Sequence, residues 1–385
     1  MQATAQHNWL LYCRPGFERD CVQETQAGQI EAATGSGFAV VYGKPRLVYA
    51  QLAFARQLIR LHGEVNNLPE RDRLTPLLAA LPAEPQQFGA LWLEVPDTNE
   101  GKLLSSFARR FQPLLEAALI KAGRMKTNSP AGVELAEAKT KLPASNRPST
   151  GSGRTEILPR LHIFFPDQSR ALIGSSDPRN GAAWPMGILR QKMPHDAPSR
   201  SYLKLAEAFE TFLDQEQQKT CLKPGMVAVD LGAAPGGWTW QLARRGLKVI
   251  AVDNGPLKGA AAQHPAIKHL RQDGFRYRPS RPVDWVVCDM VEQPQRVAAL
   301  MADWISSSLA DRAIFNLKLP MKKRLEALTG ALNGVRAALD AKGIRYRLEA
   351  KQLYHDREEV TVFLARVKPS KSSSRHSGEG RNPVD

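Results

Sequence analysis

The stretch Ala228-Val-Asp-Leu-Gly-Ala-Ala-Pro-Gly-Gly-Trp238 decides the fold of this chain. Its first residues are apolar or β-branched, which favours a buried strand. Gly232 and the Pro235-Gly236-Gly237 triplet then predict a tight turn, and a helix is expected over residues 238–246. A strand, a glycine-rich turn and a helix in this order predict a βα unit that cradles a nucleotide-like ligand. Glycines let the backbone approach such a ligand, and the helix N-terminus offers unpaired N–H groups.

The spacing of the turn residues narrows the choice of ligand. A dinucleotide fingerprint reads G-x-G-x-x-G and a P-loop ends in Gly-Lys-Ser/Thr, and this turn has neither pattern. It has Asp230 before the turn and Pro235 inside it. Such a loop suits a ligand without phosphates, such as S-adenosylmethionine, whose ammonium group can meet an acidic residue. The alternative is an ordinary strand-turn-helix of an α/β domain.

Strands and helices alternate after this unit, which predicts a doubly wound parallel sheet. Further strands are expected at 247–252, 267–270, 283–288, 313–317, 345–353 and 360–367, and a helix at 321–341. Polar residues stand at the predicted carboxyl ends of five strands: Asp230, Asp253, Asp273, Asp289 and Lys318. Ligands bind outside these ends, so the sequence predicts one site there.

Two of these acids have a predicted contact with the cofactor. Asp253 ends the second strand, about 20 residues after the glycine turn, where a carboxylate commonly binds ribose hydroxyls. Asp273 precedes Gly274 and suits a polar contact at the adenine edge. A single acid at a strand end also caps helices or makes turns, so only the whole set of polar strand ends indicates a ligand site.

The first 190 residues predict a separate α+β domain that grips the substrate. Strands are expected at 8–13, 37–42, 45–52, 91–95, 161–165 and 170–174, and helices at 18–26, 71–81 and 102–122. Arg56 and Arg60 stand four apart in 52–61, which is typical of a solvated helix face and, in a basic protein, of phosphate contacts. The domain boundaries predicted are 1–190, 191–368 and a disordered basic tail at 369–385.

One internal segment interrupts the N-terminal domain. Residues 125–155 are rich in Pro, Ser, Gly, Thr, Asn and Lys and have few large apolar residues, which predicts a flexible insertion. The tail has a similar composition. Both are expected to be disordered, with weak RNA contacts as the second interpretation.

Composition favours an RNA or DNA partner. The 385 residues carry a formal net charge of +15 and a pI of about 9.8. The alternative is a merely basic protein with a basic tail. The four cysteines contain no C-x-x-C, so neither a metal site nor a disulfide framework is predicted. No run reaches about 18 apolar residues, so no membrane span is expected and the protein is expected to be cytoplasmic.

The second domain begins with a predicted helix after Pro198. Ser199 or Ser201 is its expected cap, and Lys204 lies one turn into it. A lysine at such a position is ordinarily a surface residue. A functional role for Lys204 is predicted only in combination with other residues of the chain.

Four residues in short motifs resemble a known tetrad. Lys204 in Arg-Ser-Tyr-Leu-Lys-Leu, Asp289 in Val-Val-Cys-Asp-Met, Lys318 in Asn-Leu-Lys-Leu-Pro and Glu359 in Arg-Glu-Glu-Val-Thr-Val are similar to the Lys-Asp-Lys-Glu set of FtsJ-like ribose 2′-O-methyltransferases. Longer strings resemble the bacterial 23S ribosomal RNA (cytidine-2′-O)-methyltransferase M family: 13–18, 97–100, 196–201, 252–256, 315–324 and 352–362. The resemblance covers nearly all of the chain except the insertion and the tail.

The resemblance implies a fold, a cofactor and a substrate. It implies an N-terminal THUMP-type region with a ferredoxin-like part that binds RNA, followed by a Rossmann-like methyltransferase domain with a mixed seven-stranded sheet. The cofactor would be S-adenosylmethionine, and the substrate a cytidine in the peptidyl-transferase loop of 23S ribosomal RNA. A monomer or weak oligomer is expected. The chain departs from the family in the insertion and in Ala234, where the family has cysteine.

The tetrad suggests a mechanism for methyl transfer to a ribose hydroxyl. Lys318 is predicted as general base, which requires a neutral amine and hence a pKa below the usual ~10.4. Burial and the second cation, Lys204, are expected to lower it. Lys204 would also steer the ribose and stabilise developing oxyanion, while Asp289 and Glu359 position the two ammonium groups.

The predicted cofactor contacts surround the glycine turn. The backbone from Ala234 through Pro235 and Gly236 to Gly237 would wrap the methionine part. Asp230 and Gly232, which precede this loop, are also predicted to bind the cofactor. Asp253 would take the ribose hydroxyls and Asp273 would face the adenine. Two further residues are predicted to contact the cofactor. Asp289 would reach it from the end of the fourth strand, and Ser201 would close over the site.

Three other functions remain as alternatives. A base N-methyltransferase would have Asn/Asp-Pro-Pro-Tyr/Phe after the fourth strand, where this chain has Asp289-Met-Val-Glu. A C5-cytosine enzyme would need a nucleophilic cysteine, and Cys288 is expected to point into the core. A catalytically silent RNA-binding or assembly factor would not need the tetrad.

Overall fold

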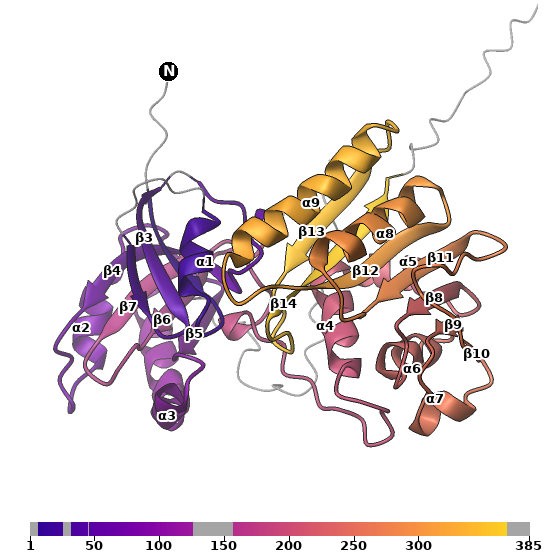
Figure 1. The fold of residues 1–385 in the computed structure, drawn as a ribbon. Coiled ribbons are helices and arrows are strands. Elements are labelled where there is room, and N and C mark those ends of the chain that lie inside the picture. Colours follow the sequence, from indigo (N-terminus) through magenta and orange to yellow (C-terminus); the bar gives the residue numbers. More distant parts are fainter. Residues whose placement is uncertain (1–6, 26–31, 45, 126–156, 368–385) are drawn as a thin grey trace, which may run out of the picture.

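The computed structural model describes residues 7–25, 32–44, 46–125 and 157–367. In these ranges the chain forms two seven-stranded sheets, each with its own helices (Figure 1). The N-terminal half lies to the left in the view and the C-terminal half to the right. The insertion and tail predicted from composition fall almost entirely outside the described residues.

The N-terminal sheet has the order β2-β3-β1-β4-β7-β6-β5, and only its β5–β6 pair is parallel. Its strands are β1 (His7–Tyr12), β2 (Ala32–Gly35), β3 (Phe38–Lys44), β4 (Gln57–Val65), β5 (Ala90–Glu94), β6 (Arg160–Phe164) and β7 (Ala171–Ser176). Its helices are α1 (Glu18–Gln23), α2 (Leu74–Ala79) and α3 (Asn99–Lys121). The predicted α+β class of this half is confirmed.

The C-terminal sheet has the order β10-β9-β8-β11-β12-β14-β13. Its strands are β8 (Val227–Leu231), β9 (Lys248–Val252), β10 (Ile267–Leu270), β11 (Val283–Cys288), β12 (Ala310–Lys318), β13 (Tyr346–Lys351) and β14 (Glu359–Arg366). β14 inserts between β12 and β13 and runs antiparallel to both, so the sheet is mixed. The doubly wound parallel pattern therefore holds for β8 to β12 only.

Helices cover both faces of this sheet. They are α4 (Tyr202–Phe212), α5 (Gln215–Cys221), α6 (Gly237–Ala243), α7 (Gly259–Gln263), α8 (Pro294–Ser306) and α9 (Arg324–Asp340). Along β11, Val286 and Cys288 pack in the cluster with α8 and α9, whereas Trp285 and Val287 pack in the cluster with α4 and α6. This alternation follows from the two-residue period of a strand buried on both faces.

The two halves share one hydrophobic core. The cluster beneath α8 and α9 continues through Phe17 and Cys21 of the α1 region and through Leu52 and Phe54 of the segment before β4. The backbone N–H of Gln352, just after β13, also donates to Ala53 O at 2.7 Å. The N-terminal half is therefore packed onto the C-terminal sheet rather than tethered by a linker alone.

Two N-terminal predictions were wrong. Residues 45–52 were expected to be a strand, but they contain the short 3₁₀ turn η1 (Tyr49–Gln51). Residues 52–61 were expected to be a helix with Arg56 and Arg60 on its solvated face, but β4 occupies their second half. Arg60 is exposed, whereas Arg56 is 4% exposed against the C-terminal half. A spacing of four is even, so it places residues on one side of a strand as readily as on one face of a helix.

Within the described residues, no helix combines the length and the apolar character that a membrane crossing requires.

Candidate active site

Three of the four tetrad residues come from neighbouring strands of the C-terminal sheet. Asp289 directly follows β11, Lys318 ends β12, and Glu359 begins β14 opposite Lys318 in the antiparallel register. Because side chains alternate along strands, all three lie on the face covered by α4. Lys204 is on α4 itself. The tertiary fold thus brings together the four residues that the sequence singled out.

Each carboxylate of the tetrad lies between two ammonium groups. Lys318 Nζ is 2.5 Å from Asp289 Oδ1 and also pairs with Glu359. Lys204 Nζ is 3.4 Å from Asp289 Oδ2 and pairs with the other oxygen of Glu359. The Glu359 side chain is 7% exposed and that of Lys318 is 24% exposed, so water screens these pairs far less than surface pairs.

The electrostatics of Lys318 differ from the prediction. Desolvation lowers the pKa of Lys318, but the charges and hydrogen bonds of Asp289 and Glu359 outweigh it, and the pKa is raised above its ordinary value. The expectation that burial and Lys204 would lower this pKa was wrong for the protein by itself. The reason is that two carboxylates, and not one cation, are the nearest charged groups.

Three residues behind the tetrad were not predicted as site residues from the sequence. Asn316 Nδ2 donates to Asp289 Oδ1 at 2.9 Å and lies 3.5 Å from Glu359 Oε2. Thr361 stands opposite Asn316 in the β12–β14 register, and its hydroxyl is 2.7 Å from Asn316 Oδ1. Asp356 Oδ2 lies 2.9 Å from the same hydroxyl. The available signal was position: Asn316 stands two residues before Lys318 and hence on the same strand face.

The glycine turn has the conformation that its sequence predicted. Gly232 has φ +78° and Gly236 has φ +111°. A Cβ on Gly232 would lie 2.4 Å from Met290 Cγ, and a Cβ on Gly236 would lie 2.6 Å from Ala261 Cβ. Side chains are therefore excluded, and backbone lines the space between β8 and α6.

The acids at the ends of β8 and β9 hold this turn. Asp253 Oδ2 accepts from the backbone N–H of Ala234 at 2.9 Å and Oδ1 from that of Gly255 at 2.7 Å. Asp230 accepts from the Thr239 hydroxyl at 2.5 Å, while its Oδ1 is buried without a hydrogen-bond partner among the described residues. Burial raises the pKa of Asp230 to about 7.

These features fit S-adenosylmethionine. The turn offers backbone at close range, as a ligand that lies against it requires. The unpaired Asp230 oxygen is an acceptor close to the turn, and a nearby ammonium group would lower the pKa of this carboxyl. The Asp253 oxygens keep further lone pairs for hydroxyl groups.

Ser201 lies against the start of α6. A Cβ on Gly237 would be 2.3 Å from Ser201 Oγ and 2.5 Å from Ser199 Oγ, so these hydroxyls sit directly over the helix N-terminus. The predicted capping role is corrected: Ser201 is the N-cap position of α4, but no side chain caps that helix, and the two serine hydroxyls pair at 2.7 Å.

Two other candidate residues differ in their surroundings. Asp273 is exposed, and its carboxylate accepts from the backbone N–H of Phe275 at 2.8 Å, so it shapes the turn after β10. Cys288 is 0% exposed, and burial raises its pKa to about 12. A buried neutral thiol is not a nucleophile, so the C5-cytosine alternative loses its required residue.

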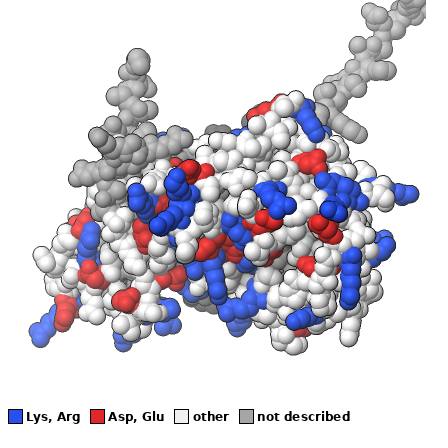
Figure 2. Space-filling view, viewed as in Figure 1, with Lys and Arg blue, Asp and Glu red and all other residues white. Residues whose placement is uncertain are grey.

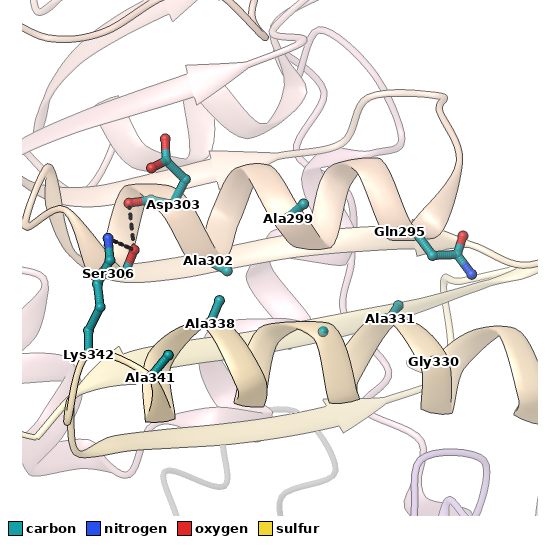
Figure 3. Close-up of a pocket in the computed structure, with 11 residues that line it drawn as sticks. Gln295, Ala299, Ala302, Asp303, Ser306, Gly330, Ala331, Ala338, Ala341 and Lys342 are labelled. Carbon is teal, nitrogen blue, oxygen red and sulfur yellow. Dashed lines mark hydrogen bonds between the residues drawn. The ribbon is translucent and has the colours of Figure 1, made fainter.

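A pocket of about 410 Å³ lies elsewhere, between α8 and α9 (Figure 3). Small side chains such as Ala302, Ala331 and Ala338 form most of its wall, and Lys342 donates to Ser306 Oγ at 2.9 Å at one end. None of the predicted site residues lines it. The pocket belongs to the opposite face of the sheet from the tetrad.

Three family models and several named proteins match this chain. The model of FtsJ-like methyltransferases matches residues 197–322, that of the N-terminal region of ribosomal RNA large subunit methyltransferase M matches 72–134, and that of the RlmM ferredoxin-like domain matches 6–45. Ribosomal RNA large subunit methyltransferase M of Laribacter hongkongensis is 53% identical over 93% of this chain and 96% of its own. The protein of the same name from Methylococcus capsulatus is 45% identical over 94% of this chain and 99% of its own length. The chain therefore belongs to the ribosomal RNA large subunit methyltransferase M family of S-adenosylmethionine-dependent methyltransferases.

Proposed function

We propose that this enzyme methylates the ribose 2′-hydroxyl of a cytidine in the peptidyl-transferase loop of 23S ribosomal RNA. The observation that carries the proposal is the tetrad, in which Lys204 and Lys318 share Asp289 and Glu359 at the sheet edge beside the glycine turn. The names of the relatives support ribosomal RNA of the large subunit as the substrate. The resemblance of the motifs supports the cytidine and its 2′-oxygen.

The reaction is a direct displacement: the hydroxyl oxygen bonds to the methyl carbon while the bond from that carbon to the sulfonium sulfur breaks. The sulfur keeps the bonding pair and leaves as a neutral thioether, and the oxygen loses its proton to the base. S-adenosylmethionine, when bound, supplies the electrophilic methyl group. Its positive sulfonium charge would disfavour the ammonium form of a lysine close by. Lys318 accepts the proton as a neutral amine. Asp289 and Glu359 hold its nitrogen in place, and Lys204 binds the ribose and stabilises charge that develops on oxygen.

The raised pKa of Lys318 sets a condition on this step. The protein by itself favours the ammonium form, because both carboxylates are within contact distance. Lys318 must therefore lose this proton to solvent before it can accept the proton of the ribose hydroxyl. Lys204 contacts the same two carboxylates, so its charge also acts on this part of the site.

The cofactor contacts are proposed at the residues around the turn. The backbone from Ala234 to Gly237 would wrap the methionine part, with Asp230 and Gly232 beneath it. Asp253 would accept from the ribose hydroxyls while it also holds Ala234 N. Ser201 would close over the methionine part, because its hydroxyl lies next to Gly237, and Asp273 would contact the adenine edge.

The RNA substrate must present an unpaired nucleotide. A-form duplexes have a deep, narrow major groove and a regular shape, and specific RNA recognition favours splayed nucleotides in loops. The chain carries a formal net charge of +15, and Lys and Arg side chains occur on both halves of the visible face, with Asp and Glu among them (Figure 2). Such a surface attracts the RNA backbone without selecting the sequence.

The direct test is methylation of unmodified 23S ribosomal RNA with labelled S-adenosylmethionine, followed by mapping of the labelled nucleotide. The proposal requires label on the 2′-oxygen of one cytidine in the peptidyl-transferase loop. Label on a base would favour N- or C-methylation, and label at another ribose would retain the reaction but not the target. Absence of label on RNA that the protein binds would favour a binding factor without catalysis.

A further inference from the structure

The N-terminal half contacts the loop that precedes Glu359. Arg14 directly follows the β1 region, and its Nη1 donates to the main-chain oxygen of Asp356 at 2.8 Å. The Arg14 backbone is itself held in a turn, since its carbonyl accepts from Phe17 N at 3.0 Å and the Phe17 ring is 1% exposed. Arg14 is therefore a fixed donor from one half of the molecule to a loop of the other.

The contacted residue is buried and joined to the sheet. Asp356 is 0% exposed, and its Oδ2 accepts from Leu353 N at 3.0 Å, which closes the loop between β13 and β14. The same oxygen is 2.9 Å from the hydroxyl of Thr361. A displacement of the Asp356 backbone would therefore move this contact as well.

The hydrogen bonds then continue to the tetrad. Asn316 must direct its amide NH₂ toward Asp289 and Glu359, because its oxygen would be repelled by two carboxylates. Its oxygen is left facing Thr361 and can only accept, so the hydroxyl of Thr361 donates its single proton to it at 2.7 Å. Burial, followed by the charge of Glu359, raises the pKa of Asp356 well above its ordinary range. Because the single proton of the Thr361 hydroxyl points to Asn316, the 2.9 Å contact between this hydroxyl and Asp356 Oδ2 requires a proton on the Asp356 carboxyl.

We propose that Arg14 is a positioning residue of the methyltransferase site, which orients Asp289 and Glu359 through this hydrogen-bonded chain. The chain runs from the N-terminal half to the tetrad through Asp356, Thr361 and Asn316. The inference deepens the proposed function and rests on it, since the tetrad is the proposed catalytic group. In consequence, the N-terminal half contributes to the geometry of the reaction in addition to any contact with RNA.

The test compares full-length Arg14→Ala, Arg14→Lys and Arg170→Ala with the unchanged protein. Arg170 is a matched control, because it is a partly exposed arginine of the same half, as Arg14 is, and forms an ion pair with Glu64. In steady-state methylation of unmodified 23S ribosomal RNA, Arg14→Ala should lower kcat by roughly 10-fold to 100-fold, because misplaced catalytic groups reduce the rate by such factors. KM for RNA and for S-adenosylmethionine should stay within about 2-fold. Arg14→Lys, which retains a donor, should recover most of kcat, and Arg170→Ala should match the unchanged protein.

A second variant breaks the chain at its other end. Thr361→Val lies inside the sheet and leaves the contact between the halves intact, and it should lower kcat in the same way. In the double variant Arg14→Ala/Thr361→Val, the loss should be smaller than the product of the two single losses, because both changes remove the same chain. Independent, multiplying losses would overturn the inference. So would an unchanged kcat with a raised KM for RNA, which would make Arg14 an RNA-binding residue.

Hydrogen exchange gives a readout that does not depend on activity. Amides of residues 353–361 should lose protection in Arg14→Ala and keep it in Arg170→Ala, and unchanged protection in Arg14→Ala would overturn the inference. If the unchanged protein methylates no ribose, the proposed function fails, and the exchange result still decides whether Arg14 orders the loop. If the protein methylates and Arg14→Ala is fully active, only the role of Arg14 fails.

Discussion

At the scale of single residues, the site consists of two lysines and two carboxylates whose charges neutralise one another. Lys318 contacts both Asp289 and Glu359, and Lys204 contacts both as well. Removal of one member leaves each of its two partners with a single counter-charge and leaves an unbalanced charge in a partly buried site, which is costly. The arrangement explains both why the tetrad is closely held and why the pKa of Lys318 is raised rather than lowered.

The first prediction concerns Lys318 itself. Lys318→Ala removes the proposed base and should lower kcat by about 10²-fold to 10⁴-fold, to the limit of detection, while S-adenosylmethionine still binds. Methylation by the purified variant and calorimetric titration with the cofactor check this. Lys219→Ala, at an exposed lysine paired with Glu216, is the control and should retain full activity. Full turnover by Lys318→Ala would contradict the assignment of the base.

The second prediction is a pH dependence. Because the base must be neutral and its pKa is raised, kcat should increase as pH rises from neutral into the alkaline range. Glu359→Gln removes one of the charges that raise this pKa, so the midpoint of the alkaline limb should move to lower pH even though the maximal rate falls. Rate profiles of single-turnover methylation measure the midpoint. Glu326→Gln, at an exposed residue of α9, should leave it unchanged, and an unshifted midpoint in Glu359→Gln would contradict the prediction.

At the scale of elements, the β8-turn-α6 unit owes its shape to two glycines with positive φ. The same unit is tied to β9 by the carboxylate of Asp253, which accepts from the backbone N–H of Ala234. A local sequence pattern was sufficient to predict the turn, because only glycine adopts these angles without strain. The neighbours that exclude a Cβ, Met290 and Ala261, come from other elements.

The third prediction tests this unit. Gly236→Ala should destabilise the protein by about 1–3 kcal/mol, because φ is +111° and the new Cβ would meet Ala261 Cβ at 2.6 Å. Its affinity for S-adenosylmethionine should also fall. Gly334→Ala in α9 is the contrast: nothing lies within 4 Å of the added Cβ, and the gain in helix propensity should raise stability by up to about 1 kcal/mol. Denaturant unfolding and cofactor titration measure both, and an unaffected Gly236→Ala would contradict the argument.

At the scale of the molecule, the two halves form one packed body with a basic composition. The shared cluster joins Phe17 and Leu52 of the first half to Val335 and Val360 of the second. The formal net charge is +15. The shared cluster fixes the N-terminal half on the C-terminal sheet, and the net charge makes binding of a polyanion sensitive to salt.

The fourth prediction follows from this charge. KM for ribosomal RNA should rise steeply with salt, with a linear relation between the logarithms of affinity and salt concentration, because bound counterions are released from the phosphates. The affinity for S-adenosylmethionine should change little over the same range, because that ligand carries no phosphate. Filter binding of RNA and calorimetry of the cofactor, in one salt series, measure the two. A flat response of RNA binding would show that charge does not drive the association.

Several features were accessible from the sequence because they depend on neighbours in the chain. The glycine turn and most strands follow from local residue types and periodicity. The order of elements placed Asp289 and Lys318 at one sheet edge. The errors arose where local patterns are ambiguous, as at residues 52–61, where an even spacing suited both a helix and a strand. The strand β2 (Ala32–Gly35) was missed because it is short and has only small and polar residues.

From the sequence by itself, local chemistry and motifs predicted the α/β class, the glycine turn and the four residues that the fold brings together as the tetrad. The mixed seven-stranded sheet that the resemblance implied is confirmed. Only the tertiary structure decided that β14 is the reversed strand, that Arg56 is buried and that contacts run from Arg14 to Asn316. It also decided that the pKa of Lys318 is raised. The physical reason is that strand register and packing bring together groups hundreds of residues apart, and the energy of a charge depends on the groups that surround it in space.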